Sequence, residues 1–425
     1  MTFKASFSIL SIFIWTVIDA SKVLVISMDG FRWDYIGKAK TPVFDEFAAK
    51  GTRAVYINPT FVTKSLPCHY SMATGLYEES HGIIANSMYD QEFDETFNYK
   101  TIDTKWWDGG EPVWITAGKQ GKKTGIYFWH GSETEIQGLR PDFYYAYNRS
   151  VPFKERVDTV VQWLSNSTFD IDLAMLYFYQ PDRTGHLYGP NSSEVISKVE
   201  EMDAILGYLV RELDKTEMLD KINIIVTSDH GMAEIDYTNR RIDVSDYIDM
   251  TAILHIPAAG PVANILPKAN MIETVFQNLS RAPHMKVYRK EEIPNRWHYK
   301  NHRRVLPILA VADEGWMIVK GPEDYKNEKG AHGYDNELSS MKPIFYARGP
   351  NVKSGYEASP FNSVDIYPLM CELLGIEPAA NNGTLDIVQN FIVKETSGVS
   401  SSEISSVSTI TLCVLVRVLI ELEKN

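Results

Sequence analysis

Six side chains of the types that bind metal ions lie in four separate stretches of this 425-residue chain. They are Asp29 in SMDG, Asp182 and His186 in PDRTGH, Asp229 and His230 in TSDHG, and His332 in AHGYDN. A hydroxyl group that can act as a nucleophile, that of Ser65 in TKSLPCHY, belongs with them. Mixed carboxylate and imidazole ligands favour zinc or a similar first-row metal, whereas calcium and magnesium favour oxygen ligands alone. The residue types therefore predict a zinc centre beside a serine.

These side chains divide into two adjoining cation sites. One ion is assigned three ligands: Asp182, His186 and His332. The other is assigned four: Asp29, Asp229, His230 and the hydroxyl oxygen of Ser65. Two cations about 4 Å apart can stabilise both the attacking and the leaving oxygen of a displacement at phosphorus. We therefore expect two Zn²⁺ ions and phosphoryl transfer, with Ser65 as the attacking group.

Three short apolar runs position these ligands. Residues 23–28, 173–179 and 222–227 are typical of buried β-strands, and an aspartate follows each run closely. In an open α/β sheet, ligands bind beyond the carboxyl ends of the strands. An isolated aspartate after a strand is usually a helix N-cap, and an isolated histidine usually has a structural role. Three strands that point such residues at one edge favour a functional site instead.

Longer motifs identify a family that the chain resembles. They are MDGFRWDY, ATGLYEESHGIIAN, PDRTGHLYGP, TSDHGM, AHGYDN and GIEPAANNGT, and they lie in this order between residues 22 and 393. The chain is similar to the ectonucleotide pyrophosphatase/phosphodiesterase family, of the short type with a single catalytic domain, within the alkaline-phosphatase superfamily. The resemblance implies an α/β fold, a three-layer α/β/α sandwich with a mostly parallel central sheet and a small α+β insertion. It also implies a metal-dependent phosphoric diester hydrolase that forms a phosphoseryl intermediate.

The nucleophile motif departs from the family pattern. The family usually has threonine in a T-F-P-N-H-Y setting, whereas this chain has Ser65 in S-L-P-C-H-Y. Serine supplies the same kind of alkoxide, so we expect catalysis to be retained. Cys68 replaces an asparagine that is expected to hold a phosphoryl oxygen, and a thiol is a weaker donor. The cysteine form is similar to the choline-phosphodiester branch of the family.

The resemblance implies four substrate-binding residues: Lys64, Asn86, Trp129 and Tyr147. The family holds a nucleobase between an aromatic residue after the nucleophile and a tyrosine, and these positions are Leu66 and Tyr147 here. We favour hydrolysis of nucleotide phosphodiester or pyrophosphate bonds. One alternative is a choline-phosphodiester lipid hydrolase of the lysophospholipase C or sphingomyelinase type. Another is an inactive cell-surface binding protein that has kept the fold.

The ends of the chain predict its location. Residues 1–20 resemble a secretory signal peptide, and residues 21–393 form the phosphodiesterase catalytic domain, with the insertion at about 236–329. Residues 394–406 form a Ser-rich spacer. Residues 407–425 form a hydrophobic tail, which fits a membrane tether, a lipid-anchor signal or an unstructured end. We expect an extracellular protein, either secreted or anchored at the cell surface.

The glycosylation sequons agree with an extracellular location. The net charge narrows the classes of molecule that we expect the protein to bind. Five Asn-x-Ser/Thr sequons are present, at Asn148, Asn166, Asn191, Asn278 and Asn382. The three cysteines cannot build a disulfide framework, so stability must come from the core. A formal net charge of −13 disfavours nucleic-acid binding, which needs a basic face. It does not exclude small anionic substrates, because divalent cations dominate the local field of a metal site.

Overall fold

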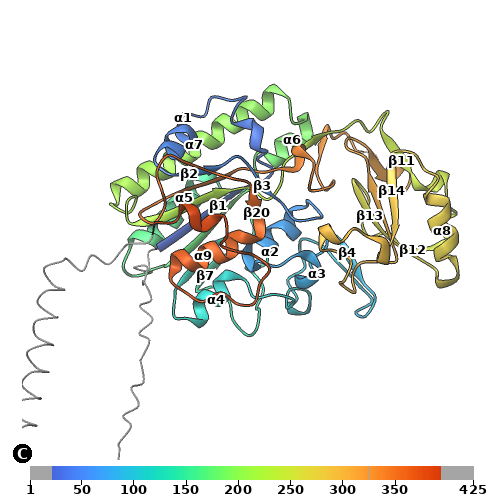
Figure 1. Cartoon of the computed structure of the whole chain (residues 1–425), viewed down its shortest axis with the longest axis horizontal. Coiled ribbons are helices and arrows are strands. Elements are labelled where there is room, and N and C mark those ends of the chain that lie inside the picture. The colour runs from blue at the N-terminus through green and yellow to red at the C-terminus, as the bar shows by residue number, and fades with distance from the viewer. Residues whose placement is uncertain (1–21, 325, 394–425) are drawn as a thin grey trace, which may run out of the picture. The chain divides into compact units, whose positions relative to one another are not determined.

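The computed structural model describes residues 22–324 and 326–393, and the predicted signal peptide, spacer and hydrophobic tail lie outside this part. An eight-stranded sheet forms the centre of the described structure (Figure 1). Its strands, in spatial order, are β19 (Tyr356–Ala358), β2 (Thr52–Ala54), β18 (Phe345–Arg348), β9 (Ile222–Thr227), β1 (Lys22–Met28), β8 (Leu173–Phe178), β6 (Thr124–Tyr127) and β7 (Phe143–Tyr145).

Neighbouring strands of this sheet are parallel except at β18, which runs antiparallel to both β9 and β2. The three predicted strands are confirmed as β1, β8 and β9, which lie side by side at the centre. Nearly every residue in them is buried. Continuous apolar runs of this kind are what a parallel sheet covered on both faces requires.

Helices cover both faces of the sheet, which confirms the predicted three-layer α/β/α sandwich (Figure 1). One layer contains α1 (Pro42–Ala49), α5 (Phe153–Ser165) and α7 (Ser193–Lys215). The opposite layer contains α2 (Ser65–Thr74), α4 (Val113–Lys119) and α9 (Ile366–Leu374). In α7, buried residues such as Val195, Val199 and Met202 recur every three or four positions, so one face of the helix packs onto the sheet.

The predicted α+β insertion is a second, smaller sheet with its own core. Its four antiparallel strands, in spatial order, are β12 (Ile253–His255), β13 (Val262–Pro267), β15 (Ile308–Ala312) and β14 (Met285–Arg289). The helix α8 (Ile272–Leu279) packs against them. At its base, β10 (Ala233–Glu234) pairs with β17 (Gly330–Ala331), so the chain leaves and re-enters the main sandwich at adjacent points.

The remaining regular elements are short and lie at the edges of these two units. Three two-stranded pairs are β3 (Ile57–Asn58) with β20 (Phe361–Asn362), β4 (Met88–Asp90) with β5 (Glu95–Phe97), and β11 (Arg241–Asp243) with β16 (Met317–Val319). Two short helices are α3 (Glu78–His81) and α6 (Asp182–Tyr188). The second of these begins at one of the predicted metal ligands.

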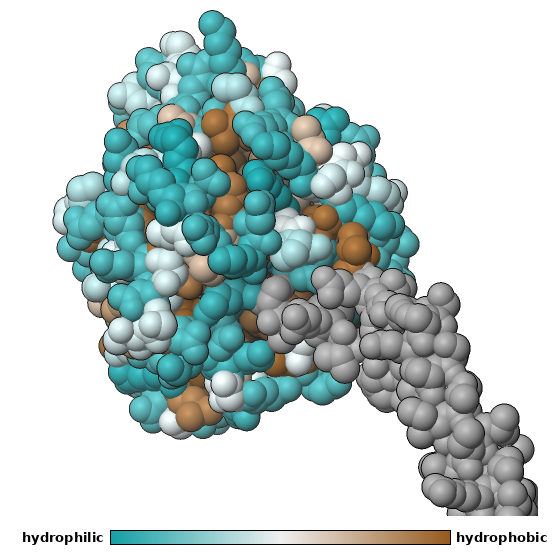
Figure 2. Space-filling model, turned by 90° about the vertical axis from the view of Figure 1, so that its left-hand side faces the viewer, coloured by the Kyte–Doolittle hydropathy of each residue, from teal (hydrophilic) through white to brown (hydrophobic). Residues whose placement is uncertain are grey.

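Stability comes from packing in the part of the chain that the structure describes. Cys68 and Cys371 are both buried free thiols there. No helix within residues 22–324 and 326–393 is long and apolar enough to cross a membrane. The face shown in Figure 2 is mainly hydrophilic, with hydrophobic residues exposed in narrow stretches between polar ones. Such scattered apolar exposure is normal for a folded protein.

Candidate active site

The ends of the three central strands hold three aspartates close together. The backbone N–H of Asp29, directly after β1, donates to the carbonyl of Phe178 at the end of β8 (2.9 Å). The N–H of Asp182 donates to the carbonyl of Asp29 (2.9 Å), and the N–H of Gly30 donates to Oδ1 of Asp229 (3.1 Å). Gly30 has a φ of +67°, and a Cβ there would lie 2.7 Å from the Cα of Asp182. Only glycine permits this close approach.

One of the two predicted ligand groups surrounds Asp182. His186 lies one helical turn after Asp182 in α6, and its Nε2 is 3.4 Å from Asp182 Oδ1. The Nε2 of His332, which follows β17, is 3.5 Å from the same oxygen. The structure therefore brings together the three residues that were assigned to the first ion.

The second predicted group lies beside the first. The Nε2 of His230 is 3.0 Å from Asp229 Oδ2 and 3.6 Å from Asp29 Oδ1. The Oγ of Ser65 is 3.2 Å from the same nitrogen. Ligand atoms of Asp29, Asp182 and His230 all lie within 4.8 Å of one another, so the two groups adjoin. The structure thus gathers all seven predicted metal-binding residues at one edge of the sheet.

The three histidines share one orientation that suits metal binding. Their Nδ1 atoms lie 2.8 to 2.9 Å from backbone carbonyl oxygens: His186 from Gly330, His230 from Gly231, and His332 from Thr63. A carbonyl can only accept, so each Nδ1 carries the proton and each Nε2 presents a lone pair to the carboxylates. Metal-ligating histidines are usually fixed in this way by the other ring nitrogen.

The three aspartate carboxylates form a site that needs cations to balance their charge. Within the described residues, Asp29 Oδ1, Asp182 Oδ1 and Asp229 Oδ2 are buried and accept no hydrogen bond. Burial raises the pKa of Asp29 well above its usual value, and the charges of Asp229 and Asp182 raise it further. Buried carboxylates of like charge are unfavourable unless a cation is shared between them. The donor set and its unpartnered oxygens therefore fit two divalent metal ions.

Ser65 is the first residue of α2, so its hydroxyl lies at the positive end of that helix. His69, one turn later, fixes this end to the sheet. Its Nδ1 donates to the carbonyl of Ser65 (2.7 Å), and its Nε2 accepts from the hydroxyl of Ser27 in β1 (2.8 Å). Because both nitrogens of His69 are engaged, we assign it a positioning role rather than a ligand role.

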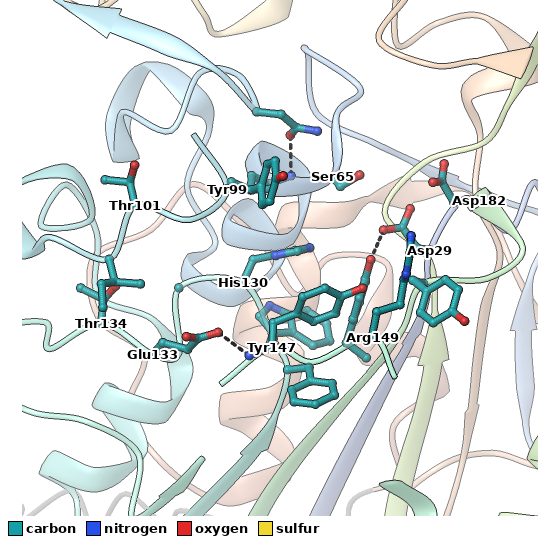
Figure 3. Close-up of a pocket in the computed structure, with 18 of the residues that line it drawn as sticks. Asp29, Ser65, Tyr99, Thr101, His130, Glu133, Thr134, Tyr147, Arg149 and Asp182 are labelled. Carbon is teal, nitrogen blue, oxygen red and sulfur yellow. Dashed lines mark hydrogen bonds between the residues drawn. The ribbon is translucent and has the colours of Figure 1, made fainter. Parts of the chain in front are cut away.

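A cavity of about 270 Å³ opens beside Ser65. Figure 3 shows Ser65, Asp29 and Asp182 together on one side of it, with Tyr147 projecting toward them. Three of the four predicted substrate-binding residues line it, namely Asn86, Trp129 and Tyr147.

Asn86 and Tyr147 present groups that a substrate can contact. The side-chain oxygen of Asn86 accepts from the N–H of Leu66 (3.0 Å), which leaves the amide N–H₂ as a donor for a phosphoryl oxygen. Tyr147 is 44% exposed, and its backbone N–H donates to Glu133 (2.7 Å) (Figure 3). Trp129 is only 1% exposed and donates its indole N–H to the carbonyl of His69, so it mainly supports the wall.

Lys64 does not line this cavity but a neighbouring one. Burial, with a smaller contribution from Lys326, lowers the pKa of Lys64 to about 8, against the opposing effects of Asp182 and Glu328. Lys64 and Ser65 are consecutive, yet they face different cavities. The predicted pocket is therefore divided between two adjoining cavities, which share Asn86 and Tyr99 in their linings.

The sequence predicted that the side chain of Cys68 takes the place of an amide that holds a phosphoryl oxygen, and this prediction is wrong. Its sulfur is fully buried, 3.6 Å from the carbonyl of Val62 and 3.6 Å from the hydroxyl of Thr60. The thiol thus faces the loop that precedes α2 rather than the cavity at Ser65. Asn86, on a loop further along the chain, supplies the amide at the cavity instead.

Several residues at the site were not predicted from the sequence. The hydroxyl of Tyr177 in β8 donates to Asp29 Oδ2 (2.6 Å), so it orients that carboxylate. A tyrosine near the end of a buried strand needs a hydrogen-bond partner for its hydroxyl, so the sequence already contained a reason to place Tyr177 at the site. His130 lines the cavity, and burial lowers its pKa to about 3, so it is neutral at physiological pH. Tyr99 and Arg149 reach the cavity from loops whose paths the sequence does not specify.

Comparison with known proteins identifies the family to which the chain belongs. Residues 23–335 match the model of the family described as type I phosphodiesterase / nucleotide pyrophosphatase. The chain belongs to this family. Membership confirms the predicted resemblance and enzyme class, a metal-dependent hydrolase of the nucleotide pyrophosphatase/phosphodiesterase type. The ligand clusters at the strand ends are the candidate metal sites of this family member.

Three relatives show how far the likeness extends. The chain is 40% identical over 404 residues to bis(5'-adenosyl)-triphosphatase enpp4 of Xenopus laevis, covering 93% of this chain and 88% of the relative. It is 39% identical over 378 residues to human ectonucleotide pyrophosphatase/phosphodiesterase family member 5, covering 88% and 78%. An inactive form of murine member 5, solved in complex with AMP, superposes with a TM-score of 0.85 at 40% identity. That match covers 88% of this chain and all of the murine chain.

Proposed function

We propose that this chain hydrolyses nucleotide phosphodiester and pyrophosphate bonds with two zinc ions, through a phosphoseryl intermediate on Ser65. One observation carries the proposal. Three unpartnered carboxylate oxygens and three imidazole Nε2 atoms converge beside the Ser65 hydroxyl, at the start of a helix. The similarity to a bis(5'-adenosyl)-triphosphatase and to murine family member 5, which was solved in complex with AMP, supports a nucleotide substrate.

Two sets of residues would hold the ions. Asp182, His186 and His332 form one set, and Asp29, Asp229, His230 and Ser65 form the other. When bound, divalent cations neutralise phosphoryl charge and lower the pKa of a coordinated hydroxyl. The hydrogen bond from Tyr177 to Asp29 and the backbone bonds to the three imidazoles would keep both sets in place.

The chain's own groups then carry out two displacements at phosphorus. The Ser65 oxygen attacks phosphorus, a new O–P bond forms, and the bond to the leaving oxygen breaks. The amide N–H₂ of Asn86 and the positive end of α2 stabilise the negative phosphoryl oxygens. Water next attacks the same phosphorus and restores the Ser65 hydroxyl. Positioning and charge stabilisation supply most of the rate in such reactions.

The first experiment measures turnover of bis(p-nitrophenyl) phosphate together with metal content. We expect a chelator to abolish turnover and added zinc to restore it. We also expect elemental analysis to find about two zinc ions per chain. Rapid acid quench during turnover is expected to trap a p-nitrophenyl phosphoryl group on the peptide that contains Ser65, because the first displacement breaks only one of the two ester bonds. Full turnover by protein free of divalent ions would refute the proposal.

The choline-phosphodiester alternative has one structural observation in its favour. The catalytic cavity is lined by the rings of Tyr99, Trp107 and Tyr147 and by the carboxylate of Glu133. Aromatic faces bind quaternary ammonium groups through cation–π attraction. Side-by-side rates on ATP, a dinucleotide, lysophosphatidylcholine and sphingomyelin separate the two classes, and a choline-lipid preference would overturn our first choice. Absence of turnover on every substrate would instead favour the inactive binding protein.

We also propose that the protein works outside the cell, either secreted or tethered to the surface. Four of the five sequon asparagines are exposed, Asn148, Asn166, Asn191 and Asn382, while Asn278 in α8 is partly buried. Exposed sequons are what glycosylation requires. The test is expression in animal cells, with the expectation of a glycosidase-sensitive protein in the medium or on the surface. Unglycosylated protein confined to the cytosol would contradict this proposal.

A further inference from the structure

His130 is a polar residue of the catalytic cavity to which the proposed mechanism gives no role. Its Nε2 is buried and has no hydrogen-bond partner within the described residues. Its Nδ1 forms no hydrogen bond there either, and the ring as a whole is only partly buried because it lines the cavity. Polar groups inside folded proteins are nearly always paired. An unpaired imidazole in the wall of an active site is therefore available to a bound substrate.

The ring lies between the reacting centre and the exposed ring of Tyr147. It makes edge contacts with His69 (ring centroids 4.8 Å apart) and with Tyr177 (5.0 Å). Tyr177 in turn contacts Tyr147 (6.0 Å). A ring nitrogen of His130 also lies within 4.8 Å of a carboxylate oxygen of Asp29. Figure 3 shows the edge of the ring that carries the nitrogens turned toward Ser65.

This position faces the part of a diester that follows the phosphoryl group. A substrate whose phosphorus is at Ser65, and whose ester group extends toward Tyr147, passes over His130. In a nucleotide, the part directly after the ester oxygen is the sugar. We therefore expect the sugar, rather than the base, to meet the imidazole.

The chemistry of the ring favours a hydroxyl group as its partner. Burial lowers the pKa of His130 to about 3, so the ring is neutral. In a neutral imidazole, one nitrogen donates and the other accepts. A hydroxyl group can do both, so it can bond to Nδ1 in either tautomer. A phosphoryl oxygen can only accept, and the trimethylammonium group of a choline ester can neither donate nor accept.

A third metal ion is a weaker explanation for the same side chain. Ligand atoms of Asp29, His69 and His130 are close enough to share a cation. Both ring nitrogens of His69 are already engaged, with the carbonyl of Ser65 and with the hydroxyl of Ser27. Asp29 belongs to the ligand set of the second ion. A third ion would thus have His130 as its one uncommitted ligand.

We propose that His130 is a substrate-binding residue, whose Nδ1 forms a hydrogen bond with a ribose hydroxyl of the nucleotide. The inference rests on the proposed function and adds a residue that determines specificity for the sugar. The bond would fix the sugar between the phosphoryl group at Ser65 and the cavity wall at Tyr147. It would also favour nucleotides over choline esters, which carry no hydroxyl group in this position.

The first measurement uses the unsubstituted protein and changes only the sugar. The substrates are the p-nitrophenyl esters of uridine 5'-phosphate and of its 2'-deoxy and 3'-deoxy forms, which share one leaving group. We expect kcat/KM to fall about three- to tenfold on one of the two deoxy esters, which is the effect of losing one hydrogen bond between neutral groups. Equal values for the three esters would overturn the proposal without the need for any variant.

The second measurement repeats the comparison in a matched pair of variants. His130→Asn and His130→Leu remove the ring equally, but the asparagine amide keeps a polar group close to the position of Nδ1. We expect the preference for the hydroxyl-bearing ester to disappear in His130→Leu and to be partly retained in His130→Asn. Because the result is a ratio between esters, a general loss of activity in both variants does not affect it.

Thr134→Val is the control. Thr134 also lines the cavity, and its hydroxyl is also buried without a partner in the described residues, but Figure 3 shows it on the opposite side of the cavity from Asp29. The control should keep the sugar preference of the unsubstituted protein. If the preference survived in His130→Leu, or disappeared in Thr134→Val instead, another residue would bind the hydroxyl and the proposal would be wrong.

These outcomes are distinct from failure of the proposed function. Equal hydrolysis of the three uridine esters would refute only the role of His130, because the enzyme would still act on nucleotide esters. If bis(p-nitrophenyl) phosphate were hydrolysed and none of the uridine esters were, the nucleotide preference would be refuted together with this inference.

Discussion

The ligand cluster and the catalytic cavity beside it are built in different ways. The cluster comes from strand ends and first helical turns, and its imidazoles are each bonded to a backbone carbonyl. The cavity is lined mostly by loop residues between 99 and 149, including the exposed Tyr99 and Tyr147. Rigid elements hold groups to the precision that chemistry requires, while loops vary which molecule is accepted. We therefore expect changes in the cluster to affect kcat and changes in the cavity to affect KM.

The largest expected effect is at Ser65. Ser65→Ala removes the attacking oxygen and should lower kcat by at least about 10³-fold, with zinc content nearly unchanged because the other ligands remain. Kinetics on bis(p-nitrophenyl) phosphate and elemental analysis measure both. Ser65→Thr is the matched control, since it retains a hydroxyl and should retain most activity. If the alanine variant stayed active, Ser65 would not be the nucleophile.

The next effect concerns the residue that orients Asp29. Tyr177→Phe deletes one hydrogen bond (2.6 Å) to that carboxylate and leaves the ring in place. Loss of such a partner costs about 10- to 100-fold in metal affinity or activity. We expect weaker zinc binding and lower kcat with little change in KM, measured by zinc titration and steady-state kinetics. A change in KM alone would place Tyr177 with the cavity instead of the cluster.

Tyr147→Ala tests the cavity side of the comparison. The substitution removes an exposed ring from the cavity that Leu66 also lines, and loss of an aromatic stacking surface for a base is worth about 1–3 kcal/mol. We expect KM for nucleotide substrates to rise about tenfold, with little change in kcat. Tyr147→Phe keeps the ring and serves as the control. A fall in kcat at constant KM would show that the cavity contributes to catalysis rather than to binding, which would contradict the expected difference between cavity and cluster.

The smallest expected effect is on acid stability of the cavity wall. Arg304 donates to Asp90 (2.8 Å) and to the carbonyl of Trp106 (3.0 Å), and Trp107 lines the cavity. Burial raises the pKa of Asp90, but hydrogen bonds from Arg304 and backbone N–H groups outweigh it, so the net shift is downward. A carboxyl whose pKa is lower in the folded state stabilises the protein above its unfolded value, about 3.9. That contribution is lost as pH falls through the folded pKa.

We therefore expect Asp90→Asn to lower Tm on the order of 2–4 °C at pH 7. The difference from the unsubstituted protein should shrink steadily below about pH 4. Thermal unfolding followed across this pH range measures it. A difference that stayed constant with pH would show that the ionised form of Asp90 contributes nothing.

Parts of the site followed directly from local sequence. The apolar runs before Asp29, Asp182 and Asp229 were long and apolar enough to predict buried strands, and parallel strands end at a common edge. The residues that meet there could be named in advance for that reason. Cys68 could not be placed correctly, because its direction depends on how α2 packs against the loop at residues 60–62. Lys64 was predicted near the nucleophile, but not in a separate cavity.

The sequence by itself determined the central strands, the ligand set at their ends and the presence of a small inserted sheet. These depend on period, length and residue type, which are local properties of the chain. Only the tertiary structure decided which loops wall the cavity, how Tyr177 and His69 hold the cluster, and that the insertion closes a second cavity beside Lys64. These depend on contacts between residues far apart in sequence, whose geometry is set by packing of the whole fold.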